Sequence, residues 1–121
     1  MYRSMMQVFV KGSEEALEMY KNAFDGEILC AYPRENGGYM HAELNAHGQV
    51  LAVSELEGEE SAGNTMMFCF HFDEGGEMHV RRAYEVLKQG ARSCSEIGPC
   101  GYSDCQFVLV DKFGVYWCVF V

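Results

Sequence analysis

The sequence is poor in proline and in basic side chains. It has 121 residues with two prolines and no low-complexity tract, which argues against a disordered chain. Nine Lys and Arg face 18 Asp and Glu, so the net charge is −9. Nucleic acid is therefore not an expected partner, because phosphate binding requires clustered positive side chains, and a negatively charged membrane surface is disfavoured for the same reason.

Long apolar runs are also missing. No segment approaches the roughly 20 apolar residues of a membrane helix, and Met1–Ser4 carries no signal-peptide core. We therefore expect a cytoplasmic protein.

The six cysteines show no metal-binding motif. No two of them have CxxC spacing. Cys94, Cys100 and Cys105 could bind zinc, but three reduced thiols are the more usual interpretation in that compartment.

Hydrophobic residues make up 49% of the chain, which is enough for the core of one domain. Apolar periodicity and turn residues predict a strand, a helix and three strands, and then the same order again. The expected strands are 5–10, 27–32, 39–44, 49–54, 65–72, 92–97, 105–110 and 115–121, and the expected helices are 13–24, capped by Ser13, and 77–89. An acidic connection, 55–64, separates the two halves.

The two halves resemble each other in sequence. Val10–Gly26 matches Phe72–Gly90 at an offset of 62 positions, with an insertion of two residues. The closing hairpins match at an offset of 66, Gly48–Ala52 against Gly114–Cys118. This internal duplication predicts two modules with the strand order βαβββ.

Four segments, taken together, resemble a known superfamily. They are Glu14–Tyr20, Met40–Leu44, His71–Asp73 and Asp111–Trp117. Their order and spacing resemble the vicinal oxygen chelate superfamily of glyoxalase, bleomycin-resistance and extradiol-dioxygenase proteins, and its PhnB-like branch in particular. The resemblance implies an α+β fold of two tandem βαβββ modules, 1–57 and 64–121, whose sheets curl into a cup with the helices outside. It also implies a single domain over residues 1–121 and a homodimer.

The resemblance further implies where a metal would bind. Metal-using members carry His, Gln or Glu at four inward positions, and these correspond to Met5, Ala52, Met67 and Cys118. None of the four offers an oxygen or imidazole donor, so we expect no metal and no cofactor. Met5, Met67 and Cys118 could suit Cu(I), although a sulfur-rich lining is the more ordinary interpretation.

Two histidines are candidates for proton transfer. His71 shares a strand face with Met67 and Cys69, and an imidazole titrates near neutral pH. His41 shares a face with Glu43, whose carboxylate could orient the ring and raise its basicity. Either histidine could instead be a hydrogen-bonded structural side chain.

The sequence therefore predicts a protein that binds a small organic molecule without a metal, and leaves open whether it is an enzyme. Two other functions remain: a metal-dependent lyase or isomerase using His71, His41 or Glu43, and a structural or regulatory homodimer with a filled cup. The expected lining residues are Met5, Gln7, Phe9, His41, Ser54, Met67, Cys69, His71 and Cys118.

Overall fold

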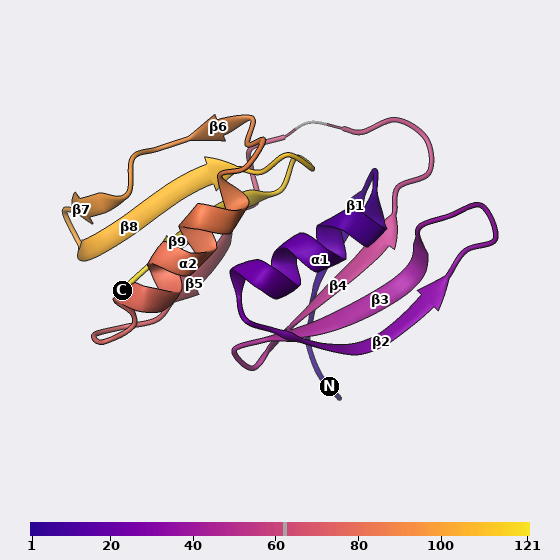
Figure 1. The fold of residues 1–121 in the computed structure, drawn as a ribbon, viewed down its shortest axis with the longest axis horizontal. Helices are drawn as coiled ribbons and strands as arrows, with labels where there is room; N and C mark the ends of the chain where they lie inside the picture. The colour runs from indigo at the N-terminus through magenta and orange to yellow at the C-terminus, as the bar shows by residue number, and fades with distance from the viewer. Residues whose placement is uncertain (62) are drawn as a thin grey trace. The chain divides into compact units, whose positions relative to one another are not determined.

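The computed structural model describes residues 1–61 and 63–121, and the chain divides into two compact units, 1–61 and 62–121. Within the described residues each unit contains one helix packed against one mixed sheet (Figure 1). Neither sheet closes on itself. The predicted α+β class is confirmed.

The first unit is a helix on a four-stranded sheet. Its elements are β1 (Met6–Val10), α1 (Ser13–Ala23), β2 (Glu27–Pro33), β3 (Tyr39–Ala46) and β4 (Gln49–Glu55). The strand order is β1-β4-β3-β2, in which β1 runs parallel to β4 and the other neighbours are antiparallel.

The second unit repeats this topology. Its elements are β5 (Phe68–His71), α2 (Glu77–Leu87), β6 (Ser93–Cys94), β7 (Gly98–Cys100), β8 (Ser103–Val110) and β9 (Tyr116–Phe120). The order is β5-β9-β8-β6, with β5 parallel to β9, and β7 also pairs with β8. The position of β2 in the first unit is thus taken in the second unit by two short strands, β6 and β7, which both pair with β8.

The strand register reproduces the sequence repeat. Gln7 lies opposite Ala52 in the first unit, and Cys69 lies opposite Cys118 in the second. These two pairs are related by the offsets of 62 and 66 positions that the sequence showed. The duplication therefore extends from the order of the elements to individual residue pairs.

Each sheet has a helix side and an open face, the side away from its helix. On the helix side of the first unit, α1 packs Leu17 and Tyr20 against a core that includes Leu44 and Val53, and all four residues are buried. In the second unit, Tyr84 of α2 contacts the Phe107 ring at 5.2 Å. Register partners share a face, so Phe70, Trp117 and Val119 lie on the same side as Phe107.

Three expectations about local structure were wrong. Ser13 does not cap α1: it is the first helical residue, and its hydroxyl donates to Oε1 of Glu55 at 2.8 Å. The Glu55 carboxylate caps the helix instead, accepting from the backbone N–H of Gly12 at 3.1 Å and of Ser13 at 2.9 Å. β5 begins at Phe68 rather than at residue 65, and β7 occupies a segment expected to be a loop.

Candidate functional site

The open face of the first unit has a buried carboxylate near its centre. Glu43, on β3, is 6% exposed. Its oxygens accept two hydrogen bonds from the Arg3 guanidinium, at 2.5 and 2.9 Å, and one from Nε2 of His41 at 2.8 Å. The hydrogen bonds from Arg3, and then that from His41, lower the pKa of Glu43 to about 2. The carboxylate is therefore ionised at neutral pH.

This carboxylate determines which nitrogen of His41 carries the proton. An ionised carboxylate only accepts hydrogen bonds, so the bond to Glu43 requires a proton on Nε2. In the neutral imidazole Nδ1 then has the free lone pair. The His41 side chain is 33% exposed, so a small molecule can reach it. The ring can accept a hydrogen bond or a proton at this position.

A polar pair lies beside this cluster. Nε2 of Gln7 donates to the Ser54 hydroxyl at 3.2 Å and to the backbone oxygens of Val8 at 3.0 Å and Ala52 at 3.4 Å. Ser54 is 5% exposed, whereas its register partner Phe9 is 59% exposed. The side-chain amide of Gln7 is therefore satisfied largely by backbone oxygens, and the neighbouring ring of Phe9 faces outward.

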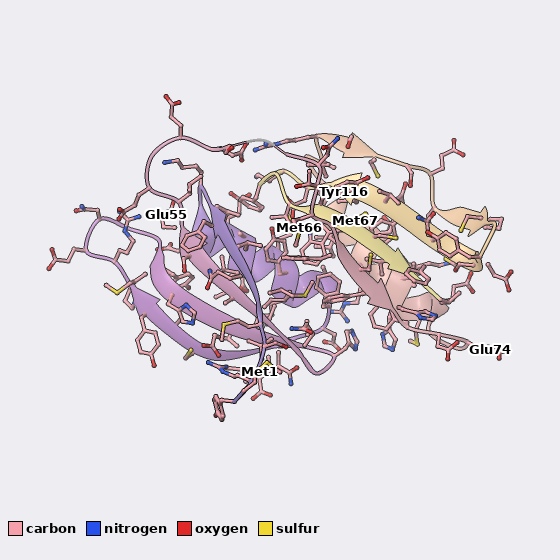
Figure 2. All side chains as sticks on the ribbon, turned by 180° about the vertical axis from the view of Figure 1, so that it is seen from behind. Met1, Glu55, Met66, Met67, Glu74 and Tyr116 are labelled. Atoms are coloured by element: carbon pink, nitrogen blue, oxygen red, sulfur yellow. The ribbon has the colours of Figure 1, made fainter. Side chains whose placement is uncertain are left out.

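Phe9 and Ser54 also line a surface cavity of about 700 Å³ in the first unit. Its other lining residues are Pro33, Arg34, Glu35, Asn36, Tyr39, Met40, Glu55, Leu56 and Glu57. Concave sites that combine aromatic surface with a few polar groups are the usual form of small-molecule sites. Glu55, at the end of β4 (Figure 2), is already engaged as the cap of α1.

The open face of the second unit is rich in sulfur. Cys118 is 3% exposed and Cys69 is exposed. Nε2 of Gln106 donates to Sγ of Cys118 at 3.6 Å, and the Tyr102 hydroxyl lies 3.9 Å from the same sulfur. Contact with Cys118, followed by burial, raises the pKa of Tyr102 to about 12. Although Cys69 as a whole residue is exposed, partial burial of its thiol and then the neighbouring Cys118 raise the pKa of this thiol.

His71 is at the end of the same face. It is exposed, and its ring stacks on Phe120 with centroids 4.5 Å apart and planes inclined by 13°. Tyr102 meets Phe120 edge-on at 5.3 Å. These three rings form an aromatic surface next to the thiols.

The two methionines expected to line the site lie at corresponding positions of the two units. Met5 directly precedes β1 and is half-buried, and Met67 directly precedes β5 and is 39% exposed. Figure 2 shows Met67 near Tyr116, the first residue of β9. Within the first unit the structure thus groups Gln7, Phe9, His41 and Ser54, and within the second it groups Cys69, His71 and Cys118.

Two contributors to these faces were not predicted. Arg3 lies before β1, in a segment without periodicity, so only its charge could have drawn attention to it. Tyr102 lies in the turn before β8, where the sequence suggested a loop. Both reach their partners through tertiary contacts: Glu43 is 40 residues from Arg3, and Cys118 is 16 residues from Tyr102.

The residues do not fit the superfamily's usual metal centre. By the resemblance, its four positions correspond to Met5, Ala52, Met67 and Cys118, which offer two thioethers, a methyl group and one thiol. Zn²⁺ and Mn²⁺ need nitrogen, oxygen or several thiolate donors. Among residues 1–61 and 63–121, no group of three or more His, Cys, Asp or Glu side chains is arranged to hold a metal ion.

Two repeated βαβββ units, each with one helix on one side of a mixed sheet, are the fold of a known superfamily. A family model for the glyoxalase/bleomycin resistance protein/dioxygenase superfamily matches residues 4–119, and the chain belongs to this superfamily. Its members bind small molecules and are often dimers. None of the curated proteins matches the sequence significantly. Within the described residues no helix is long and apolar enough to cross a membrane.

Solved structures agree with this fold. A PhnB protein from Bacillus cereus is 20% identical, with a TM-score of 0.81 and coverage of 98% of both chains. Protein PA1353 from Pseudomonas aeruginosa is 19% identical, with a TM-score of 0.81 over 99% of this chain and 97% of that one. The fosfomycin resistance protein FosX from Listeria monocytogenes is 11% identical, with a TM-score of 0.71 over 98% and 91%.

Proposed function

We propose that this protein binds a small organic molecule on the open face of its first unit, without the superfamily's usual four-ligand metal centre. The observation that carries the proposal is the buried, ionised Glu43, held between Arg3 and His41 on that face. Burying an ionised group costs free energy unless it is paired. Such a cluster leaves His41 oriented and accessible.

The surrounding residues indicate which ligand chemistry suits the face. Phe9 and Tyr39 offer aromatic surface in the cavity, and Nδ1 of His41 offers a hydrogen-bond acceptor. β3 and β4 are antiparallel with Ala42 opposite Val53, which brings His41 and Ser54 to neighbouring positions. A ligand with a flat apolar part and an O–H or N–H donor would use both features.

An anilinonaphthalene sulfonate dye tests this proposal, because it combines flat rings, an N–H donor and strong fluorescence in apolar sites. We expect saturable binding to the wild-type protein, weakened about threefold or more by Phe9→Ala and by His41→Ala, which is roughly 0.7 kcal/mol or more. Met78→Ala is the matched control, because Met78 is 72% exposed on α2. If the control weakens binding as much as the two site variants, the dye site lies elsewhere.

A second candidate function is proton-transfer catalysis, as in a lyase or isomerase. The His41–Glu43 pair favours it, because an oriented imidazole with an ionised carboxylate partner is a common general base. In the metal-dependent form of this function, an ion would have to bind through His41, Glu43 or His71. Metal analysis of protein purified without a chelator tests this metal-dependent form. One ion per chain would favour it, and metal far below one ion per chain would count against it.

We also propose that modules 1–57 and 64–121 act as one glyoxalase-type domain, and that the chain forms a homodimer. Dimers are frequent in the superfamily, and exposed strand edges favour association. All six cysteines are free, which suits a reducing compartment such as the cytoplasm. Light scattering at micromolar concentration should give twice the chain mass of 13.7 kDa. A monomer mass would favour ligand binding by the single chain and exclude the structural homodimer.

A further inference from the structure

Cys69 and Cys118 lie side by side on neighbouring strands. β5 and β9 are parallel, and the two cysteines are register partners, so their side chains leave the same face of the sheet. Neighbouring strands are about 4.8 Å apart. That spacing falls within the roughly 4.4–6.8 Å between Cα atoms that a disulfide requires. The backbone is therefore placed to accept a covalent link between these residues.

The two thiols differ in accessibility. Cys69 is exposed on the open face, whereas Cys118 is 3% exposed and covered by contacts with Gln106 and Tyr102. Nε2 of Gln106 donates to Sγ of Cys118 at 3.6 Å, which holds that sulfur in place on the open face. Cys69 is thus the thiol that a reagent meets first, and Cys118 is positioned to react with the product. Because the pKa of Cys69 is raised, its attack is expected to be slow at neutral pH and faster at alkaline pH.

The other cysteines of the second unit are not register partners of one another. Cys94 lies opposite Leu109 of β8, and Cys100 lies opposite Ser103. Those two positions on β8 are six residues apart, which is about 20 Å along an extended strand and too far for a disulfide. Cys105 is 1% exposed and shares the helix side of β8 with Phe107 and Leu109.

We propose that Cys69 and Cys118 form a redox-active dithiol that a low-molecular-weight disulfide oxidises to an inter-strand disulfide. The Cys69 thiolate attacks one sulfur of the reagent, the reagent's S–S bond breaks, and one thiolate leaves and takes up a proton. The Cys118 thiolate then attacks Sγ of Cys69, breaks the mixed disulfide and releases the second thiol. Two electrons and two protons pass from the protein to the reagent.

The product links the first and last strands of the second unit. The new bond joins β5 to β9 at two residues that lie opposite each other, and it closes a loop between positions 69 and 118. A cross-link over a loop of this length restricts the unfolded chain. The oxidised protein is therefore expected to melt at a higher temperature than the reduced protein.

Oxidation of the fully reduced protein with glutathione disulfide tests this inference. Mass spectrometry should show a loss of about 2 Da, the two thiol hydrogens, and non-reducing digestion should yield one cross-linked peptide containing Cys69 and Cys118. This test uses the wild-type protein, so its outcome does not depend on whether a variant folds. A map in which Cys69 carries only glutathione, or in which the cross-link joins other cysteines, overturns the proposal.

Three variants assign the two roles. Cys118→Ser should stop at a glutathione adduct on Cys69, and Cys69→Ser should yield neither the adduct at that position nor the cross-link. The double variant Cys94→Ser/Cys100→Ser is the matched control, because both thiols are exposed, and it should form the cross-link as the wild type does. Loss of the cross-link in this control would contradict the assignment to Cys69 and Cys118.

Discussion

Nε1 of Trp117 donates a 2.9 Å hydrogen bond to Oδ2 of Asp111, and both side chains are buried. The other carboxylate oxygen accepts from the backbone N–H of Phe113 at 2.8 Å and of Val115 at 3.0 Å. One side chain therefore fixes the turn between β8 and β9 and ties it to the largest ring of the core. The same turn sets the register of β8 and β9, in which Val108 lies opposite Cys118.

Asp111→Ala should destabilise the protein strongly. The change leaves the indole N–H and two backbone N–H groups without this acceptor, which we expect to cost about 3 kcal/mol. Urea unfolding measures the loss. Lys112→Ala is the control, because Lys112 is exposed and its substitution should change the free energy of unfolding by less than about 0.5 kcal/mol. Equal effects would mean that the turn does not depend on Asp111.

Phe70→Ala and His71→Ala should have opposite outcomes although they are adjacent. Phe70 is 9% exposed and meets Trp117 at 5.8 Å between ring centroids, so its truncation leaves a void and costs about 3–5 kcal/mol. His71 is exposed and loses only its stacking on Phe120, so we expect less than about 1 kcal/mol. Thermal melts of the two variants check this. A wild-type melt for Phe70→Ala would place the strand in the other register.

Replacing Glu43 by Gln should make stability less dependent on acidic pH. The pKa of Glu43 in the folded protein is about 2, below its ordinary value of 4.5, because Arg3 and His41 hold the ionised form. The stabilisation is therefore fully present above pH 4.5 and is lost as the pH falls towards 2.

Urea unfolding of the wild type and of Glu43→Gln, at several values between pH 7 and pH 2, measures this dependence. The difference in unfolding free energy between the two proteins should be constant above about pH 5 and should shrink on acidification. Glu18→Gln, at an exposed position of α1, controls for the general effect of removing one charge. A difference that stays constant down to pH 2 would show that Glu43 is not held ionised.

Most of the fold could be predicted because the two halves of the sequence repeat the same pattern of strands, helix and turns. Turn residues bound each strand, and the offsets of 62 and 66 positions pair the first and last strands of both halves in the register that the structure has. The β7 segment was missed because Gly98 and Pro99 are typical of loops. Proline is nevertheless tolerated on an edge strand, where its missing N–H faces away from the sheet.

The site could be predicted only in part, because its polar contacts join distant positions. The alternation of β3 put His41 and Glu43 on one face, and the structure has them 2.8 Å apart. The guanidinium that completes the cluster comes from Arg3, 40 residues before Glu43. The cap of α1 likewise comes from Glu55, 42 residues after the helix start. Local pattern gives no information about such partners.

A crystallographic soak with small aromatic alcohols and acids shows directly where this protein binds its ligand. We expect fragment density on the open face of the first unit, in contact with Phe9 and with Nδ1 of His41, and no metal ion between the fragment and the protein. Density found only on other surfaces, or a fragment bound through a metal ion at Glu43 or His41, would contradict the proposed binding site.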